Sequence, residues 1–391
     1  MRILHTVEFY YPSVGGAQEV VRQLSEHMAV AGHDVTVATS RLPGRNAGTV
    51  NGVRIVEFDV SENAVRGYRG EDVDRYKSFL VGGDFDVIMN YAAQQWATDL
   101  FFEVIDSVRA RKVLVPCGFS ALYMPSYGEY FARMPKLLEK YDATVYLAER
   151  YRDIDFAREH GVSNLHIIPN AADEREFGSL LSNDERARIR AKYGISGKLV
   201  LTIGTHTGSK GHRKSMLAFL LAPFVRGTLL IVGDEGSCRK SCEWQAAMAN
   251  RLGRLLGKKV LLLDIDREDT VRLLEAADVF LFLSTIEASP LVLFEAAAAS
   301  TPFVASRAGN SEEIARWTQG GVTVRSPATS YGYVRPSVTL AALKLARLLL
   351  DPITRKRLGE RGRRAWAKQF TWDQAAKRYL ELYEGPTKPL A

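Results

Sequence analysis

The chain has 391 residues, of which 46% are hydrophobic and 25% charged, and its formal net charge is +7. This length is too great for one ordinary core and suits two domains, and the composition is that of a globular protein rather than a disordered one. We find no apolar stretch long and uncharged enough to span a bilayer and no signal peptide at the start, so we expect a cytoplasmic protein.

The charge is divided unevenly along the chain. Residues 1–170 carry 18 basic and 22 acidic side chains, a net of −4, whereas the remainder carries 34 and 23, a net of +11. The basic half is therefore suited to hold an anion. A nucleoside diphosphate, a nucleic acid and an anionic membrane surface all fit. We expect no nucleic acid, because the basic residues lack the interleaved aromatic side chains of a stacking platform.

The first forty residues predict a strand, a glycine loop, a helix and a second strand. Residues 3–7 are apolar, Gly15 and Gly16 open a loop, and residues 17–31 have apolar side chains at helical spacing. Further strands are expected at 35–38, 53–58, 87–89, 113–115, 145–147 and 166–168. Strands that alternate with helices predict a parallel sheet covered on both faces.

The same pattern begins again after residues 169–173. A polar helix at 183–192 precedes another series of strands that alternate with helices, expected at 199–203, 229–232, 260–263, 279–283, 303–305 and 322–324. The sequence therefore predicts an α/β fold of two Rossmann-like domains, residues 1–168 and 169–372. The basic tail at 355–383 is expected to be helical.

The most informative motif follows the strand expected at 279–283. Ser289 and Pro290 predict the N-cap and first position of a helix, whose free N–H groups at Leu291 and Val292 would form a phosphate site. This helix is apolar on every side except at Glu295, so we expect it to be buried. A buried carboxylate needs a partner, which would be a ribose diol near the helix start or a nearby arginine.

A second loop, at residues 204–215, combines glycines with a lysine after a strand. This pattern is typical of a phosphate cradle, with Gly204 and Lys210 as its main members, although a flexible basic loop is the alternative. It is not a Walker A loop, because Arg213 stands where a glycine is required. Glu287, before the helix, would lie on the other side of the phosphate site or be an ordinary surface residue.

Two further patterns bear on metal binding. Asp264-Ile265-Asp266 has the D-x-D pattern of a metal-binding motif. It follows a strand where a helix should begin, so we interpret it instead as a helix cap and a wall of a base pocket. Cys238 and Cys242 lie one helical turn apart, but the sequence shows no second Cys or His pair to complete a site. We therefore expect no metal. Three cysteines in all suit a reducing compartment.

The order of these motifs resembles family 4 of the glycosyltransferases, and the resemblance covers nearly the whole chain. Members are retaining enzymes of the GT-B fold, in which two Rossmann-like domains face each other across a cleft. The matching segments are residues 15–19, 168–173, 210–211 and 232–234, the pair Glu287 and Glu295, and residues 302–306 and 309–313.

The resemblance implies a role for each motif. Glu295 would hydrogen-bond the donor ribose, Glu287 would contact the donor sugar near its reacting carbon, and Lys210 would neutralise the leaving diphosphate. The other donor-binding positions are Gly15, Gly16, Gly204, Thr205, Ile265, Ser289, Pro290, Leu291 and Val292. The C-terminal segment, from about 373 to 391, would return to the first domain.

Two positions depart from the pattern of the family. Thr205 and His206 stand where members usually carry Arg, so one phosphate contact is missing or supplied by Arg213 or Lys214. Cys117 stands where many members carry His, so we expect the acceptor or the sugar to be handled differently. Acceptor or sugar contacts are expected at Tyr11, Tyr91, Cys117, Gly118 and Phe119. The alternative is that the aromatic rings belong to the core and that Cys117 is a small buried residue.

We therefore expect a retaining, metal-independent glycosyltransferase without a cofactor. Its donor would be a nucleoside-diphosphate sugar of the UDP or GDP type, and its acceptor a saccharide or lipid-linked saccharide of cell-surface polysaccharide or glycoconjugate biosynthesis. A nucleotide-sugar epimerase on the same fold and a non-catalytic binding relative are the alternatives. The basic stretch 355–368 would either contact the anionic inner face of the cell membrane or be a solvated helix face.

Overall fold

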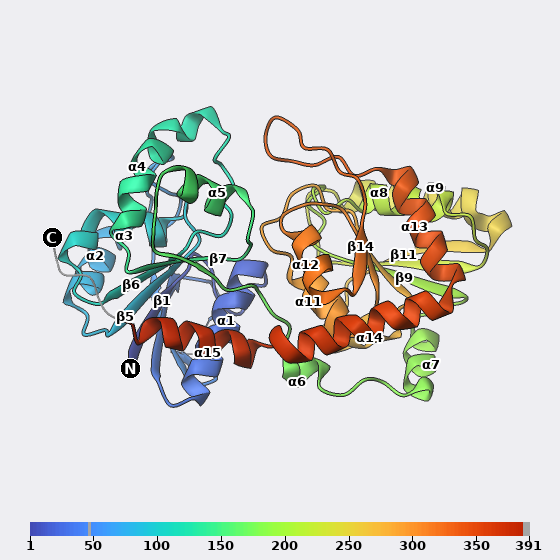
Figure 1. Ribbon diagram of the computed structural model, residues 1–391, viewed down its shortest axis with the longest axis horizontal. Helices are drawn as coiled ribbons and strands as arrows, with labels where there is room; N and C mark the ends of the chain where they lie inside the picture. The colour runs from blue at the N-terminus through green and yellow to red at the C-terminus, as the bar shows by residue number, and fades with distance from the viewer. Residues whose placement is uncertain (46–47, 386–391) are drawn as a thin grey trace. The chain divides into compact units, whose positions relative to one another are not determined.

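The computed structural model describes residues 1–45 and 48–385, and it divides the chain into two compact units (Figure 1). Unit 1 comprises residues 1–170 and the segment that returns to it at Trp372, and unit 2 comprises Ala171–Thr371. The boundaries expected from the sequence, after residues 168 and 372, lie within two residues of these positions. Each unit has its own sheet and its own core.

Unit 1 is built on an eight-stranded sheet in the order β3-β4-β2-β1-β5-β6-β7-β8, in which only the β3–β4 pair is antiparallel. Its strands are β1 (Arg2–Thr6), β2 (Asp34–Ser40), β3 (Thr49–Val50), β4 (Val53–Phe58), β5 (Val87–Tyr91), β6 (Arg111–Val115), β7 (Ala143–Tyr146) and β8 (Leu165–Ile167). Only β3 was missed. Its signal was the Asn51-Gly52 turn to β4, where both residues have positive φ, at 50° and 82°.

Helices cover this sheet, and one of them comes from the far end of the chain (Figure 1). The helices of unit 1 are α1 (Gly16–Val30), α2 (Val73–Gly82), α3 (Trp96–Val104), α4 (Gly128–Glu139), α5 (Arg152–Glu159) and α15 (Trp372–Tyr383), with short 3-10 turns η1 (Ile105–Ser107) and η2 (Pro125–Tyr127). The returning helix α15 packs on α1. The Tyr383 hydroxyl of α15 also lies 3.0 Å from Nε2 of the buried His5 in β1, which ties α15 to the sheet.

Unit 2 has a wholly parallel six-stranded sheet in the order β11-β10-β9-β12-β13-β14. The strands are β9 (Lys198–Ile203), β10 (Gly227–Val232), β11 (Lys258–Leu263), β12 (Val279–Phe282), β13 (Phe303–Ala305) and β14 (Gly321–Thr323). All six were predicted, with ends that differ by one or two residues. Long apolar runs such as Leu-Val-Leu in β9 are what a sheet buried on both faces requires.

The helices of unit 2 lie on both faces of its sheet. They are α6 (Glu174–Phe177), α7 (Asn183–Lys192), α8 (His212–Leu221), α9 (Arg239–Gly253), η3 (Arg254–Leu256), α10 (Arg267–Ala276), α11 (Leu291–Ala298), α12 (Ser311–Thr318), α13 (Val338–Leu350) and α14 (Pro352–Gln369). One core joins the sheet to α10, α11 and α14, and the other joins it to α8, α9 and α13. The tail predicted as one helical stretch is therefore two helices, α14 and α15, which break at Phe370 and Thr371.

Within residues 1–45 and 48–385, we find no helix that combines the length and the apolarity needed to cross a bilayer.

Candidate active site

The loops that follow strands β9, β10 and β12 meet at the carboxyl edge of the unit 2 sheet, where parallel α/β folds place their ligands. The Gly204 amide donates to Val232 O at 2.9 Å, so the loops after β9 and β10 begin side by side. The Thr285 amide donates to Ser209 O at 2.8 Å, which ties the β12 loop to the β9 loop. The two motifs singled out in the sequence, 204–215 and 284–299, are therefore neighbours.

Glycines are needed here because backbone segments approach closely. Gly211 has a φ of +74°, and a Cβ on it would lie 2.0 Å from Leu283 O. A Cβ on Gly233 would lie 2.2 Å from Gly204 O. No side chain fits at either place, so the cradle predicted from its glycines has a definite packing basis.

Lys210 and Glu287, the two residues predicted to act on the reacting bond, contact each other. Glu287 Oε1 accepts hydrogen bonds from Lys210 Nζ at 2.8 Å and from Ser284 Oγ at 2.7 Å. The Glu287 side chain is 11% exposed and that of Lys210 29%. This pair is thus partly shielded from water, and Ser284 is a member of the site that the sequence did not reveal.

Helix α11 begins one residue later than predicted. Pro290 is its N-cap, with an extended ψ of 114°, and Leu291 is the first helical residue. The prediction that Ser289 caps and Pro290 starts the helix is therefore wrong. A proline φ near −70° suits both positions, so only ψ distinguishes them. The helix is buried as expected, and the amides of Leu291 and Val292 in its first turn have no acceptor within the helix.

The buried Glu295 has two oxygens in different surroundings. Its Oε1 accepts from Arg267 Nη2 at 2.7 Å, and the same nitrogen lies 2.5 Å from Glu176 Oε2. Its Oε2 is buried and has no hydrogen-bond partner among the described residues. Arg267 is thus the nearby arginine expected as one alternative partner of this carboxylate, but it binds only one of the two oxygens. The other oxygen is left for a ligand.

Arg267 was not predicted as a site residue, although the three residues before it were predicted to cap a helix and to line a base pocket. It is the first residue of α10 and follows Asp264-Ile265-Asp266 directly. Asp266 is the N-cap of α10 and accepts from the Asp269 amide at 2.7 Å, so the predicted capping role is confirmed. Ile265 is half-buried against the core of unit 2.

The residues that replace the missing arginine are Thr205, which is half-buried, and His206, which is fully buried. The His206 ring lies 4.7 Å from that of His212, whose Nε2 is 3.0 Å from Gly204 O. Burial, helped by His206, lowers the pKa of His212 to about 4. A neutral His212 therefore donates to the loop backbone. Arg213, exposed, and Lys214, half-buried, begin α8 beside it.

In unit 1, the glycine loop leaves open space before α1. Gly15 is the N-cap of α1 with an extended φ of 179°, and a Cβ on Gly16 would meet no atom within 4 Å. Neither the backbone conformation nor local packing requires a glycine at Gly16. Tyr11, on the loop before it, is 50% exposed.

The loop after β6 brings together Tyr91 and Cys117, whose hydroxyl and thiol lie 3.9 Å apart. Cys117, Gly118 and Phe119 all have positive φ, at 56°, 91° and 44°. The rings of Tyr91 and Phe119 are buried, and Phe119 packs on Phe131. These two rings support the loop, and Cys117 on this loop is partly exposed.

Comparison with known proteins identifies the family. Residues 185–365 match the model for glycosyl transferases group 1, and residues 14–176 match that for glycosyltransferase family 4. The two matched segments fall on the two sheets and together span most of the chain. The protein belongs to this family of glycosyltransferases.

Two relatives match over almost their full length. N-acetyl-alpha-D-glucosaminyl L-malate synthase of Bacillus anthracis is 23% identical over 95% of this chain and 94% of its own. Phosphatidyl-myo-inositol mannosyltransferase of Mycobacterium tuberculosis is 26% identical over 98% of this chain and 97% of its own. One is named as a synthase and the other as a mannosyltransferase.

Solved structures show the same GT-B fold. Sucrose-phosphate synthase of Thermosynechococcus elongatus is similar with a TM-score of 0.76 and 20% identity, covering 98% of each chain. The Anabaena protein HepE, solved in complex with UDP-glucose, is similar with a TM-score of 0.74 and 15% identity, covering 97% of this chain and 98% of its own.

Proposed function

We propose that this glycosyltransferase takes its sugar from a nucleoside-diphosphate donor bound by unit 2, of the UDP or GDP type, and transfers it with retained configuration without a catalytic metal ion. The acceptor is a saccharide or lipid-linked saccharide. The observation that carries the proposal is Glu295, a buried carboxylate with one oxygen paired and one oxygen without a partner in the described chain, beside the first turn of α11.

The chemistry follows from charges that the site already holds. Breaking the bond between the sugar and the diphosphate leaves negative charge on the leaving group. The amides that start α11 and the ammonium of Lys210 would stabilise that charge. Lys210 would exchange its contact with Glu287 for a phosphate oxygen, which frees Glu287 to contact the sugar. The leaving phosphate would accept the acceptor proton.

Relatives support the donor class. HepE was solved with UDP and with UDP-glucose, and its fold is that of this chain.

The test is a screen of UDP, GDP, ADP, dTDP and CMP by thermal shift, with EDTA or magnesium, followed by incubation of the preferred donor sugar with glycan and lipid-linked acceptors. A ligand that binds only the folded state raises the melting temperature. We expect one diphosphate to do so equally in EDTA and magnesium, and its sugar to be transferred.

Other outcomes would contradict the proposal in different ways. Absence of any shift would remove the donor site. A shift without transfer to any acceptor would indicate a non-catalytic binding protein, and isomerised donor without acceptor would indicate an epimerase. A shift that needs magnesium would contradict metal independence.

A further inference from the structure

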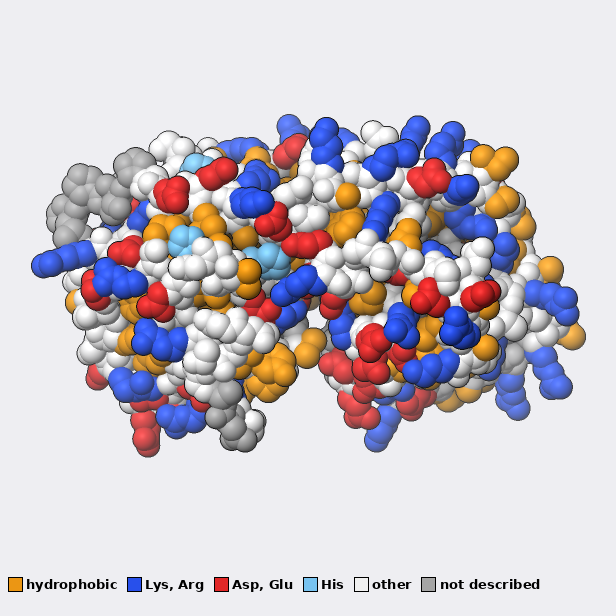
Figure 2. Space-filling view, turned by 90° about the horizontal axis from the view of Figure 1, so that it is seen from below, with side chains coloured by type: hydrophobic (Ala, Val, Ile, Leu, Met, Phe, Trp, Pro, Cys, Tyr) orange, Lys and Arg blue, Asp and Glu red, His pale blue; other side chains and the backbone are white. Residues whose placement is uncertain are grey.

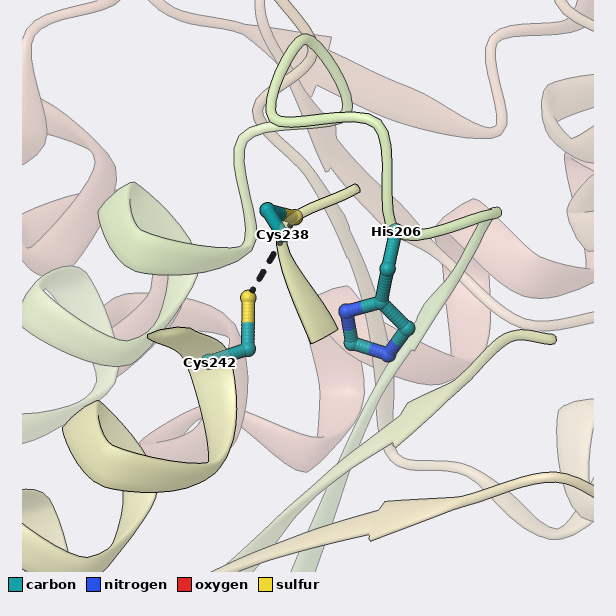
Figure 3. A group of neighbouring side chains, drawn as sticks. All are labelled: His206, Cys238 and Cys242. Atoms are coloured by element: carbon teal, nitrogen blue, oxygen red, sulfur yellow. Dashed lines mark hydrogen bonds between the residues drawn. The ribbon is translucent and has the colours of Figure 1, made fainter. Parts of the chain in front are cut away.

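A cluster of potential metal ligands lies where the loop after β9 meets the start of α9. His206 belongs to this loop, Cys238 is the N-cap of α9, and Cys242 is one turn further along α9. Figure 3 shows the three side chains around a common point. Their ligand atoms all lie within 4.8 Å of one another, and the two sulfur atoms are 3.6 Å apart.

We propose that His206, Cys238 and Cys242 bind a zinc-type transition-metal ion that fastens the β9 loop to the start of α9. Thiolate and imidazole are the ligands that Zn²⁺ prefers among protein groups. With Zn–S of about 2.3 Å and Zn–N of about 2.0 Å, neighbouring ligand atoms of a tetrahedral site lie about 3.5–4 Å apart. Shifts of under about 1 Å would bring this cluster to that geometry.

The buried histidine gives the strongest support. His206 is fully buried, and its Nδ1 has no hydrogen-bond partner among the described residues. In Figure 3 this nitrogen faces the cysteines. A buried imidazole nitrogen without a partner is costly, and a metal ion would satisfy it.

The backbone holds the ligands in place without an ion. The Cys238 amide donates to His206 O at 2.9 Å, and the Gly208 amide lies 3.2 Å from Cys238 Sγ. A Cβ on Gly236 would lie 2.5 Å from His206 O, so the β10 loop approaches the histidine closely.

Arg239 has to be accounted for, because its Nη1 lies 3.4 Å from His206 Nε2. With Nδ1 on a metal ion, Nε2 would carry the proton and could not accept from a guanidinium. Arg239 has two other acceptors, Gly233 O at 3.2 Å and Glu243 Oε1 at 2.9 Å, which it can keep. Metal binding would therefore replace only the 3.4 Å contact between Arg239 Nη1 and His206 Nε2.

The fourth position of a tetrahedral ion remains for a solvent ligand. Cys238 and Cys242 both line a cavity of about 500 Å³, beside His212 and Lys214. Three protein ligands and one water is a common zinc arrangement. The sequence prediction of no metal rested on the lack of a second Cys or His pair. His206 comes 32 residues before Cys238 and is brought to it by the sheet.

The proposal is independent of the donor site and is tested without an activity assay. The full-length protein, reduced and stripped with a chelator, is titrated with Co²⁺ alone and then with Zn²⁺. We expect one equivalent of cobalt to give a thiolate-to-cobalt charge-transfer band and the visible bands of tetrahedral cobalt, and zinc to abolish both.

Variants assign the ligands. Cys242→Ser and His206→Gln should each weaken zinc binding by more than about 100-fold, beyond the loss that outer-shell changes cause. Cys117→Ser, which alters the cysteine of unit 1, is the matched control and should bind as the unaltered protein does. Circular dichroism shows whether each variant is folded.

Three results would overturn the proposal. One is the absence of a charge-transfer band in the folded, reduced wild-type protein, which needs no variant. Another is retention of the band with unchanged affinity in His206→Gln, since two cysteines alone would then explain it. The last is loss of the band in Cys117→Ser, which would place the ligands elsewhere.

Discussion

At the scale of single residues, the two oxygens of Glu295 predict how donor binding can be separated from structural pairing. In Glu295→Gln, the amide oxygen can still accept a hydrogen bond from Arg267, but the amide nitrogen cannot accept one from a ribose hydroxyl. A hydrogen bond to a charged group contributes about 1.5–3 kcal/mol, so the Kd for the preferred nucleoside diphosphate should rise about 10- to 100-fold.

The matched control is Glu176→Gln, because Glu176 also pairs with Arg267 but lies on α6. Its Kd, measured by calorimetry, should stay within about threefold of the wild-type value, as expected for a pair with an exposed arginine. An equal loss in both variants would mean that the Arg267 network, and not the second oxygen of Glu295, supports the nucleotide.

A second prediction at this scale concerns Asp153, which lies beneath the loop of Cys117. Its oxygens accept from the amides of Gly118 at 2.8 Å and Ile154 at 2.9 Å. Burial raises the pKa of Asp153 from 3.8 to about 6, despite these bonds. The folded state therefore binds this proton more tightly than the unfolded state does. This contribution to stability is complete below about pH 4 and is lost as the pH rises through 6.

The loss amounts to about 3 kcal/mol, from a shift of about two pKa units. Asp153→Asn lacks this pH-dependent loss. The free energy of unfolding of the variant, relative to that of the wild type, should therefore rise by about 3 kcal/mol between pH 4 and pH 7. Urea unfolding at a series of pH values measures this difference. A difference that does not change with pH would show that Asp153 has an ordinary pKa.

At the scale of elements, the β9 loop depends on one glycine far more than on another. Gly211 and Gly208 both have positive φ, at +74° and +77°, so alanine strains either position by about 1–2 kcal/mol. Only at Gly211 would the added Cβ meet a backbone atom, Leu283 O at 2.0 Å. We expect Gly208→Ala to lower the free energy of unfolding by about 1 kcal/mol and Gly211→Ala by at least about 3 kcal/mol. Comparable losses in urea unfolding would mean that β12 yields to the new methyl group.

Elements were predictable from the sequence where one local signal decided them. Apolar runs located every strand but β3, and Glu295 was assigned to a buried helix because every other residue of that helix is apolar. The start of α11 was not predictable, since Pro290 fits both the cap and the first turn. Contacts between loops that follow different strands, such as Lys210 with Glu287 and His206 with Cys238, depend on the register of the sheet, which the local sequence does not specify.

Helix α14 allows the proposed membrane contact to be tested. Four exposed cations follow one stripe of this helix: Arg357, Arg361, Arg364 and Lys368. Others are used internally, as Arg363 donates to Gly178 O at 2.9 Å. Figure 2 shows cationic side chains interspersed with acidic and apolar ones on the face that it draws, so any attraction to a membrane should be weak.

We expect salt-sensitive cosedimentation with anionic vesicles, because each cation near such a surface contributes about 1 kcal/mol. The double variant Arg361→Glu/Arg364→Glu should lose most of it. Lys240→Glu/Arg251→Glu on α9, with the same change of charge at exposed positions, should retain it. Equal losses in both would indicate attraction by net charge alone, and the stripe would then be a solvated face.

At the scale of the whole molecule, the two units have separate cores. We therefore predict that donor binding slows hydrogen exchange unequally along the chain. The candidate donor residues of the β9 and β12 loops all belong to unit 2, whose cores share no residue with the large core of unit 1. A nucleoside diphosphate at 100 times its Kd stabilises the state that binds it by about 2.7 kcal/mol, which slows exchange through opening of that state about 100-fold.

Hydrogen exchange with and without the preferred diphosphate measures this distribution. We expect slower exchange in peptides that cover residues 204–211 and 284–295 and in the strands beneath them, while strands β5 to β8 of unit 1 exchange as before. Glu295→Gln at the same ligand concentration should reduce the protection to about 2- to 10-fold, because its Kd is expected to be about 10- to 100-fold higher. Protection centred on unit 1 would show that the nucleotide binds there, and the roles assigned to Lys210, Glu287 and Glu295 would all fail together.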